Sequence, residues 1–413
     1  MIVNMKKTLL ILCSALTLSA HAQKVKKAVY IIADGIPADV IEKLDLPNLK
    51  NVIKDGKYLR IHVGGDKGTY NETPTISAVG YNSLLTGTWL NKHNVPDNDI
   101  KDPNYNYQTI FRLFKEQYPA KKIGVYSSWT DNRTKLIGEG LKQTGNLKMD
   151  YKADGFELDT VHFKHKGDYM HRIDEEVVAQ ASNSVKTVAP DLSWIYLEYT
   201  DDMGHAHGDS PEFYDAVKMM DAQVGKVYEA INYRKKKFNE DWLLIITTDH
   251  GRSEANGRGH GGQSDRQRNT WLVTNYPNLN QYANVADPGI VDIMPTLARF
   301  MNVKLTGDAG REVDGTPLIG AVSVSDVKLN YFQNSIDVSW KALDTKGNVK
   351  VYVTPTNNFK TGGLDNYKLM GEYPIAQRHA LLNVKDLPSD FYKVVLEAPD
   401  NTTNKWVVIT PKK

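Results

Sequence analysis

Carboxylate and histidine side chains follow three apolar segments of the chain. Asp34 comes after the first segment, Asp201 and His205 come after the second, and the pair Asp249 and His250 comes after the third. A further histidine lies downstream in a glycine-rich run. Carboxylate oxygen and imidazole nitrogen bind zinc and comparable divalent ions. The candidate metal ligands are Asp34, Asp201, His205, Asp249, His250 and His260.

Each of these residues also has an ordinary structural explanation. An Asp before Gly, as at Asp34, is common in turns, and Asp201 with Asp202 could cap a helix. His207 lies two residues after His205 and could replace it as a ligand. The ordered set, with members at the ends of three apolar segments, favours a metal site over these separate explanations.

Hydroxyl groups that could act as a nucleophile lie between Asn71 and Gly87, where the sequence reads NETPTISAVGYNSLLTG. Thr75 and Ser77 come just before a predicted short helix over 78–85. The N-terminus of a helix presents free N–H groups and the positive end of the helix dipole, which favour a phosphate group. The alternative is that the hydroxyl only caps the helix.

Apolar runs that alternate with amphipathic stretches must position these side chains. Four continuous apolar runs predict strands buried on both faces, at 28–32, 123–126, 194–197 and 243–246. Helices are predicted at about 110–116, 173–188, 211–233 and 288–301. This alternation indicates an α/β fold with a doubly wound, mostly parallel sheet. Because the carboxyl ends of parallel strands meet at one edge, we expect the candidate ligands to converge there.

The alternation of apolar runs and amphipathic stretches ends at about residue 320. Short strand-like segments separated by turn residues fill 325–413, and they predict a small antiparallel β-sandwich. The run LPSDFYKVVLEAPDN resembles a late strand of fibronectin type III domains, with Tyr392 at the tyrosine corner. We therefore expect a catalytic domain over 23–320, followed by a fibronectin type III-like domain.

Residues 1–22 have the pattern of a secretory signal peptide. Two lysines precede a short apolar run, which ends in a small-x-small cleavage site at Ala22, before Gln23. The apolar run is too short for a transmembrane helix, and no other long apolar stretch follows, so no membrane span is expected. Lipid attachment at Cys13 is the alternative, but the bulky Leu12 disfavours it. A secreted or periplasmic protein is therefore predicted.

The composition narrows the function classes. The 413 residues include 51 Lys+Arg, 49 Asp+Glu and one cysteine. A charge so close to zero disfavours a dedicated binder of nucleic-acid duplexes, which usually has a strong basic excess. A single cysteine excludes a disulfide framework and a Cys-rich zinc or iron–sulfur site. Asp and His are therefore the available metal ligands.

Together, the motifs resemble the alkaline phosphatase superfamily, most closely its type I phosphodiesterase/nucleotide pyrophosphatase branch. The resemblance covers about 26–320 and includes the segments TPTLARFM and DGTPL, which look like the closing elements of that family. It implies an alkaline phosphatase-like fold and two divalent metal ions, usually zinc. One ion would bind Asp34, Asp249, His250 and the nucleophile, and the other would bind Asp201, His205 and His260.

The resemblance also implies the nucleophile and an oxyanion ligand. In several branches the nucleophile lies nine residues before the Thr of a Thr-Gly pair; here that Thr is Thr86, which selects Ser77, with Thr75 as the alternative. The aromatic-Pro-Asn run that usually follows the nucleophile is absent. Asn98, at the end of the run from His93, takes the place of an Asn that binds a phosphoryl oxygen in nucleotide pyrophosphatases. A phosphoseryl intermediate on Ser77 follows from these assignments.

These features predict a secreted metal-dependent hydrolase that acts on phosphodiesters or on nucleotide-like pyrophosphates. A phosphomonoesterase is the alternative, and it gains support if Arg133 or Lys135 points at the phosphate. A solvated loop is the ordinary explanation for both residues. Tyr81, Trp89 and Trp129 could stack on a base, but packing is the better explanation for each of them.

Two other functions compete with the hydrolase. A sulfatase is disfavoured because the residues after Ser77 lack the Pro and the Arg of that branch. An inactive scaffold that binds a glycan or a protein through its C-terminal sandwich is the alternative from another class. Metal analysis distinguishes the scaffold from the enzyme, because a protein without bound zinc or a comparable divalent ion would not be the predicted enzyme.

Overall fold

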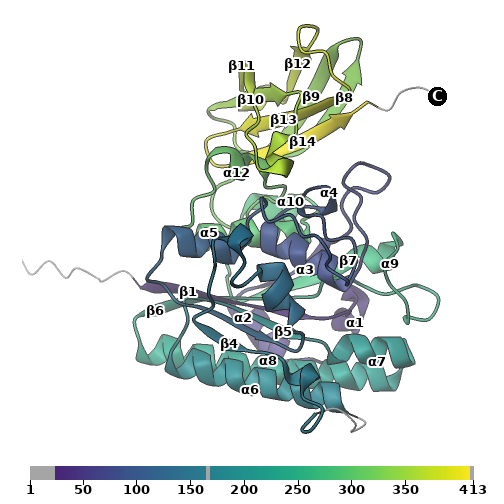
Figure 1. Ribbon diagram of the computed structural model, residues 1–413, viewed down its shortest axis with the longest axis vertical. Coiled ribbons are helices and arrows are strands. Elements are labelled where there is room, and N and C mark those ends of the chain that lie inside the picture. The colour runs from purple at the N-terminus through teal and green to yellow at the C-terminus, as the bar shows by residue number, and fades with distance from the viewer. Residues whose placement is uncertain (1–23, 164–167, 410–413) are drawn as a thin grey trace, which may run out of the picture.

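The computed structural model describes residues 24–163 and 168–409. The predicted signal peptide, 1–22, lies outside these residues. A layered α/β part comes first, and two antiparallel sheets follow from Val324 (Figure 1). Within the described residues, no helix combines the length and apolar character needed to cross a membrane.

A seven-stranded sheet forms the centre of the α/β part, with the strand order β2-β7-β6-β1-β5-β3-β4. Its strands are β1 (Val25–Ala33), β2 (Lys57–His62), β3 (Ile123–Ser127), β4 (Tyr151–Ala153), β5 (Leu192–Leu197), β6 (Glu240–Thr247) and β7 (Asn269–Thr274). β1 is parallel to both β5 and β6, and β3 is parallel to both β5 and β4. This confirms the mostly parallel sheet expected from the sequence.

One strand of this sheet runs against its neighbours. β7 is antiparallel to both β6 and β2. Neither β2 nor β7 is among the strands predicted from the sequence. β2 reads KYLRIH and is only partly buried, so it lacks the continuous apolar run that marks the central strands.

Helices cover both faces of the sheet (Figure 1). They are α1 (Ala38–Lys43), α2 (Pro47–Asp55), α3 (Ser77–Thr86), α4 (Leu90–His93), α5 (Ile110–Gln117), α6 (Tyr169–Thr187), α7 (Tyr199–His207), α8 (Pro211–Lys237), α9 (Asp265–Arg268), α10 (Gln281–Val285), α11 (Ile293–Phe300) and α12 (Gly307–Glu312). α1, α2, α6 and α8 pack on one face, and α3, α5 and α11 pack on the other. The predicted last helix is divided into a 3-10 turn at Ile290–Asp292 and α11.

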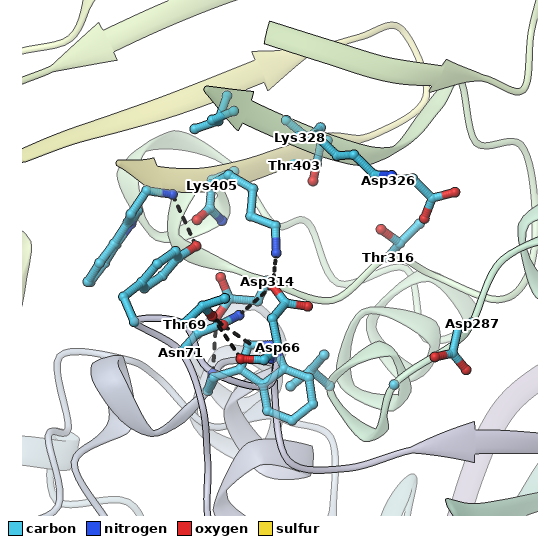
Figure 2. A pocket seen from close by; sticks show the side chains of 18 of the residues that line it. Asp66, Thr69, Asn71, Asp287, Asp314, Thr316, Asp326, Lys328, Thr403 and Lys405 are labelled. Atoms are coloured by element: carbon cyan, nitrogen blue, oxygen red, sulfur yellow. Dashed lines mark hydrogen bonds and ion pairs between the residues drawn. The ribbon is translucent and has the colours of Figure 1, made fainter. Parts of the chain in front are cut away.

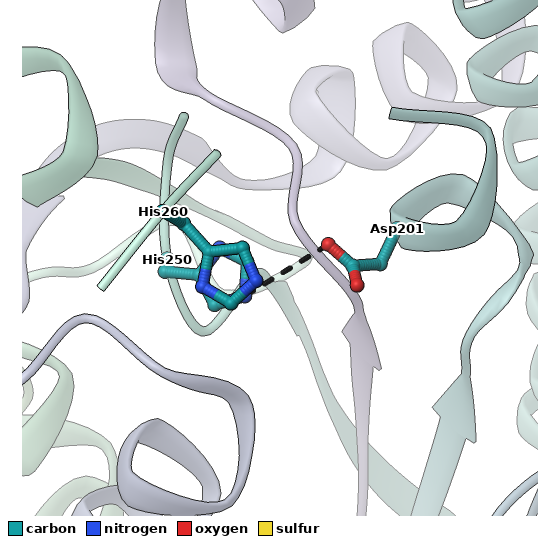
Figure 3. Close-up of side chains that lie close together, drawn as sticks. All are labelled: Asp201, His250 and His260. Atoms are coloured by element: carbon teal, nitrogen blue, oxygen red, sulfur yellow. Dashed lines mark ion pairs between the residues drawn. The ribbon is translucent and has the colours of Figure 1, made fainter. Parts of the chain in front are cut away.

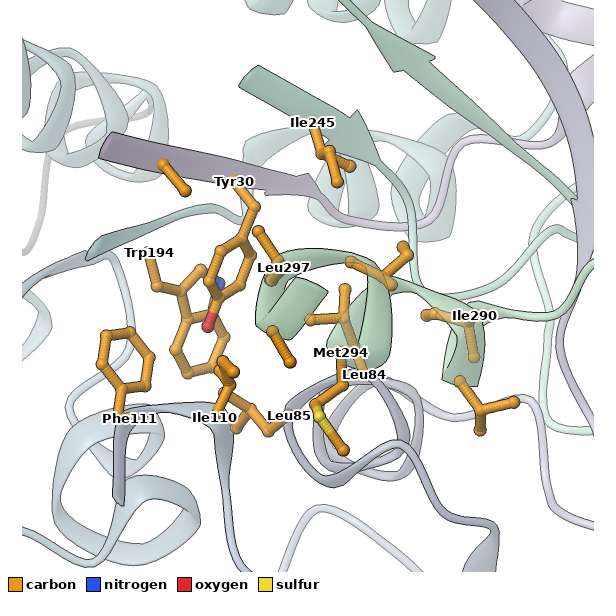
Figure 4. Packing of buried hydrophobic residues seen from close by; sticks show 14 of the residues in the cluster. Tyr30, Leu84, Leu85, Ile110, Phe111, Trp194, Ile245, Ile290, Met294 and Leu297 are labelled. Atoms are coloured by element: carbon orange, nitrogen blue, oxygen red, sulfur yellow. The ribbon is translucent and has the colours of Figure 1, made fainter. Parts of the chain in front are cut away.

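Alternating side chains of β1 explain why its sequence is apolar without interruption. Val29 and Ile31 are buried among the helices of one face, while Tyr30 is buried on the other face. The Tyr30 ring stacks on Trp194 of β5 at a centroid distance of 6.0 Å, next to α5 and α11 (Figure 4). A strand buried on both faces needs apolar residues at every position.

Seven strands form the two C-terminal sheets: β8 (Val324–Phe332), β9 (Ser335–Ala342), β10 (Asn348–Thr354), β11 (Lys368–Pro374), β12 (His379–Asn383), β13 (Phe391–Glu397) and β14 (Thr402–Val408). Their orders are β11-β10-β13-β14 and β12-β9-β8, and every pairing is antiparallel. The Tyr392 hydroxyl donates to the carbonyl of Leu387 at 2.7 Å, the bond expected of a tyrosine corner. The fibronectin type III likeness and the boundary near 320 stay predictions.

Candidate active site

The candidate ligands lie where three neighbouring strands end. β1 is paired with β5 on one side and with β6 on the other, so their carboxyl ends are adjacent. Asp34 directly follows β1, and Asp249 follows β6 after one residue. β5 leads into α7, whose first turn holds Asp201, with His205 one helical turn later on the same side. The strand ends therefore bring together ligands that lie more than 200 residues apart in the sequence.

Asp34, Asp249 and His250 form one cluster, whose ligand atoms all lie within 4.8 Å of one another. His250 Nε2 is 3.3 Å from Asp34 Oδ1 and 3.3 Å from Asp249 Oδ2. The other ring nitrogen, Nδ1, is 2.9 Å from the carbonyl of Gly251, to which it donates its proton. Nε2 is then unprotonated and has a lone pair available for a metal ion. Asp34 Oδ1 and Asp249 Oδ2 are buried, and within the described residues neither has a hydrogen-bond partner.

Asp201, His250 and His260 form a second cluster, also within 4.8 Å (Figure 3). His205 adjoins it, since His205 Nε2 is 3.2 Å from Asp201 Oδ2 and 3.0 Å from His260 Nε2. His260 Nδ1 is 3.0 Å from the carbonyl of Thr75, which holds the ring and leaves its Nε2 facing His205. Neither cluster includes His207.

The electrostatics of these clusters favour a divalent cation. Burial, and next the charge of Asp201, raises the pKa of Asp34 to about 7. Burial, and next the charge of Asp34, raises the pKa of Asp249 well above its ordinary value. Two buried carboxylates with unbonded oxygens carry a large desolvation cost unless a cation offsets it. The buried oxygens and free imidazole nitrogens therefore fit metal ions of the kind that Asp and His bind.

Ser77 lies beside both clusters. It is the first residue of α3, and its Oγ is 3.3 Å from Nε2 of His250, the histidine that the clusters share. The N-cap of α3 is Ile76, so the Ser77 hydroxyl is not a capping group. Thr75 uses its hydroxyl differently, since Oγ1 donates to the carbonyl of Gly262 at 2.9 Å and accepts from the N–H of Gly261 at 3.0 Å. Thr75 holds the loop of His260, so of these two candidates Ser77 is the one whose hydroxyl contacts a residue of the clusters.

Asn98 contacts the backbone next to Ser77. Its Oδ1 accepts a hydrogen bond from the N–H of Ala78 at 3.0 Å, and the residue is exposed. Its amide nitrogen makes no bond to the described residues, so its two protons remain available for a ligand. Asn98 therefore lies beside Ser77, the predicted nucleophile, and its role as an oxyanion ligand stays a prediction.

Three residues without a predicted role at the metal site support the clusters. Tyr81 and Tyr196 both direct their hydroxyls at Asp34 Oδ2, the Tyr196 bond being 2.7 Å long. Arg252 is fully buried and donates to the side chain of Asp201 and, at 2.8 Å, to its carbonyl. Arg252 lies two residues after His250, so the sequence could have suggested that it belongs to the site. Nothing in the sequence around Tyr81 and Tyr196 suggests their contact with Asp34.

Arg133, one of the two cations proposed for substrate binding, is occupied by carboxylates. Its Nε donates to Asp154 at 2.5 Å, and its Nη1 donates to Glu139 at 2.5 Å. The guanidinium is also largely buried, with a side chain that is 17% exposed. It therefore has little capacity left for a phosphate group.

Lys135, the other proposed cation, lies against the loop that carries Asn98. Its side chain is 43% exposed, and its Nζ forms an ion pair with Asp131 Oδ2 at 2.7 Å. Nζ also lies 3.4 Å from the carbonyl of Asp99, the residue after Asn98. Of the two cations, Lys135 is therefore the one that is near the site with part of its charge open to solvent.

The aromatic candidates are partly occupied by packing. Tyr81 is fully buried, and Trp129 packs edge-on against it at 6.4 Å while remaining half-buried. Trp89 is 6% exposed and stacks on His62 at 5.8 Å. Among the three, Trp129 keeps the most surface for a ligand.

A cavity lies elsewhere, between the α/β part and strands β8 and β14 (Figure 2). Its volume is about 1410 Å³, and its walls include Asp66, Asp314, Asp326 and Lys405. None of the candidate metal ligands lines it. It is therefore distinct from the site described above.

Comparison with known proteins shows the family of this chain. The chain matches the family described as type I phosphodiesterase / nucleotide pyrophosphatase over residues 28–272, which is more than half of its length. Venom phosphodiesterase 2 of Crotalus adamanteus is 25% identical over 234 residues, covering 54% of this chain and 26% of that protein. GPI ethanolamine phosphate transferase 1 of Yarrowia lipolytica is 23% identical over 244 residues, covering 57% and 25%. The chain thus spans about a quarter of the length of these two relatives.

Among solved structures, a 2-O GAG sulfatase has a TM-score of 0.50 at 12% identity, covering 88% of this chain and 86% of that one. That likeness concerns the fold. The family match contains the strand ends and all the candidate ligands from Asp34 to His260. This chain belongs to the type I phosphodiesterase / nucleotide pyrophosphatase family, within the alkaline phosphatase superfamily.

Proposed function

We propose that the protein is a secreted two-metal phosphodiesterase or nucleotide pyrophosphatase that forms a phosphoseryl intermediate on Ser77. The observation that carries this proposal is the position of Ser77 Oγ, 3.3 Å from the histidine nitrogen that both ligand clusters share. The family match supports the reaction class. The catalytic domain would comprise 23–320.

The ligand assignment is part of the proposal. Asp34, Asp249 and His250 would hold one ion together with Ser77. Asp201, His205 and His260 would hold the other. When bound, such ions supply positive charge that lowers the pKa of a nearby hydroxyl and offsets charge on a leaving oxygen. Zinc suits this mixture of imidazole and carboxylate ligands.

The chain itself supplies the nucleophile and the oxyanion contacts. Ser77 Oγ gives up its proton to solvent and forms a bond to phosphorus, while the bond from phosphorus to the leaving oxygen breaks and that oxygen takes up a proton from solvent. Water then hydrolyses the phosphoseryl group and regenerates the hydroxyl. The Asn98 amide and the free N–H groups at the start of α3 would hold a non-bridging oxygen as its charge increases.

A diester or pyrophosphate substrate is favoured because, of the two basic side chains proposed for phosphate binding, only Lys135 is partly exposed and Arg133 is held by carboxylates. A monoester carries a dianionic phosphate, which such sites often bind with arginine. Arg133 is held by Asp154 and Glu139 instead. A nucleotide-like group could lie against the exposed part of Trp129.

A phosphomonoesterase remains the second candidate, favoured by the partly exposed ammonium group of Lys135 near Asn98. An inactive scaffold is less well supported, because the ligand atoms of both clusters converge. The transferase among the relatives adds a third outcome to test, since a phosphoseryl group could pass to an acceptor other than water.

The test compares bis-p-nitrophenyl phosphate with p-nitrophenyl phosphate on one zinc-loaded preparation. We expect the diester to be cleaved with the higher kcat/KM. Ser77→Ala should abolish turnover, and Thr75→Ser, which keeps both hydrogen bonds of the hydroxyl, should retain most of it. A phosphoryl group should be trapped on Ser77 by mass spectrometry.

Three results would contradict the proposal. A clear preference for the monoester would overturn the substrate class. Activity retained in Ser77→Ala would overturn the assignment of Ser77 as the nucleophile. A folded protein without bound divalent ions after zinc loading would overturn the enzymatic role.

A further inference from the structure

A buried histidine, His93, joins helix α3 to the loop that carries Asn98. It is the last residue of α4 and is fully buried. Its Nε2 is 3.0 Å from Ser83 Oγ, which lies six residues after Ser77 in α3. Its Nδ1 accepts a hydrogen bond from the N–H of Val95 at 3.2 Å. One imidazole thus contacts both the nucleophile's helix and the start of the loop.

The hydrogen-bond directions determine the protonation of this ring. Ser83 Oγ donates its single proton to the carbonyl of Val79 at 2.8 Å, so it must accept from His93 Nε2–H. Nδ1 accepts from a backbone N–H and must be unprotonated. Burial lowers the pKa of His93 to about 3, so the neutral ring persists at neutral pH. Both ring nitrogens are fully used in one tautomer.

The loop from Asn94 to Asn104 is closed at its base by the same histidine. The N–H of Asn104 donates to the carbonyl of His93 at 2.9 Å, and the Asn94 side chain donates to the carbonyl of Asp102 at 2.8 Å. Asn98 lies at the other end of this loop, where its Oδ1 accepts from Ala78 N–H at 3.0 Å. The loop is therefore attached to α3 at its base and at its tip.

The residue before His93 anchors the opposite side of α4. Lys92 is fully buried and donates to the carbonyl of Glu312 at 2.7 Å and to the Asn404 side chain at 2.9 Å. Asn404 belongs to β14 of the C-terminal sheets. α4 is thus held between the C-terminal sheets and α3, so its connection to Ser83 has little room to shift.

We propose that His93 is a positioning residue, which sets the distance between the Asn98 amide and the oxyanion by fixing the Asn98 loop to α3. This inference rests on the proposed function, because it takes Asn98 as the oxyanion ligand. An exposed loop residue with one bond to the protein needs such support, since small displacements of a catalytic group cost much of its effect. Substituting His93 should leave the ligand clusters intact, since its hydrogen bonds go to none of their residues.

The experiment is a double-mutant cycle between His93 and Asn98 on the zinc-loaded full chain with the diester probe. Asn98→Ala alone should lower kcat by about 10²–10³-fold. His93→Phe, which keeps a ring but loses both hydrogen bonds, should lower kcat by about 10–100-fold with little change in KM. In the Asn98→Ala background, His93→Phe should lower kcat by less than about 2-fold, because the group it positions is gone.

Two further variants guard against a general loss of stability. Ser83→Ala removes the partner of His93 Nε2, together with the bond from Ser83 Oγ to the carbonyl of Val79 within α3, and leaves the His93 ring in place. It should also lower kcat, again only when Asn98 is present. Asn275 is a matched control: it is buried and bridges Leu244 and Trp242 by two 2.8 Å bonds at the other end of β6. Asn275→Leu should lower the melting temperature and leave kcat unchanged.

The outcomes separate the two proposals. If the kcat losses of His93→Phe and Asn98→Ala are additive in the double mutant, the positioning role of His93 is overturned. The same holds if Ser83→Ala lowers kcat in the Asn98→Ala background. In both cases Asn98→Ala alone would still lower kcat, so the oxyanion role of Asn98 would stand. Unchanged kcat in Asn98→Ala would overturn the oxyanion role itself. If His93→Phe does not fold, the Ser83→Ala cycle decides the question alone.

Discussion

A Cβ atom on Gly204 would lie 2.0 Å from the Cζ atom of Arg252. Gly204 lies inside α7, between the ligand candidates Asp201 and His205. Its missing side chain leaves the space that the buried guanidinium occupies while it donates to Asp201. The pair Gly204 and Arg252 therefore determines how Asp201 is presented to its cluster.

Gly204→Ala should weaken metal binding although alanine is the better helix former. In a helix interior the change would ordinarily gain about 1 kcal/mol, but here the new Cβ must displace Arg252. We expect a zinc affinity about 10–100-fold lower by calorimetry, the range seen when partners of metal ligands are lost. Ala206→Gly, at an exposed position of the same helix, is the control for helix propensity. Equal affinities in Gly204→Ala and the parent chain would refute this account.

Tyr81→Phe should lower metal affinity through Asp34. The hydroxyls of Tyr81 and Tyr196 both bond to Oδ2 and turn Oδ1 toward His250. Losing one of them should weaken zinc binding by about 10-fold, because Tyr196 remains. Tyr30→Phe is the matched control, since Tyr30 is also fully buried and its hydroxyl has no partner within the described residues. An equal loss in both variants would mean that packing, not the bond to Asp34, is responsible.

The candidate ligands could be predicted from the sequence because each follows an apolar run or a glycine motif. Asp34 and Asp249 needed only the rule that parallel strands end at one edge, and the structure places both there. The paired strands β2 and β7 could not be predicted in the same way. β2 is an edge strand of mixed polarity, and its register with β7 depends on contacts across more than 200 residues.

The residues that orient the ligands were harder to predict for a similar reason. Tyr81 and Tyr196 have the pattern of ordinary core aromatics, and only the packed sheet shows that their hydroxyls meet at Asp34. His93 belongs to the motif that contains Asn98, but its bond to Ser83 depends on the angle between α3 and α4. The charge of Arg133 suggests phosphate binding, whereas the sequence does not show that Asp154 and Glu139 pair with it.

Arg133→Met should therefore lower stability rather than alter substrate preference. Asp154 and Glu139 would lose a partly buried partner, and the loss should be about 1–3 kcal/mol in denaturant unfolding. KM for the diester and for the monoester should stay within about 2-fold of the parent values, a range set by the small effect of distant charges. Lys135→Met is the comparison, because its ammonium group is near Asn98 and should raise KM when removed. A large rise in monoester KM in Arg133→Met would restore the phosphate-binding role.

Zinc should stabilise the protein more strongly as pH rises. In the metal-free protein the pKa of Asp34 is raised to about 7, and that of Asp249 is also raised, by burial and by neighbouring carboxylates. An unfolded Asp titrates near about 4. Between these values the folded state holds protons that the unfolded state has released, so the stability that these two carboxyl groups contribute to the metal-free protein is greatest at low pH and is lost as pH rises from about 4 toward 7.

Bound zinc removes this penalty, because the ionised carboxylates then face positive charge. The difference in melting temperature between zinc-loaded and EDTA-treated protein should therefore grow between about pH 5 and pH 7.5, by an amount equivalent to a few kcal/mol, roughly 1.36 kcal/mol for each unit of pKa difference. Asp34→Asn removes one of the titrating groups, so the EDTA-treated series should lose less stability as pH rises. A difference that stays constant with pH in the parent protein would show that neither carboxylate titrates in this window. It would contradict the view that the desolvated carboxylates of Asp34 and Asp249 drive metal binding.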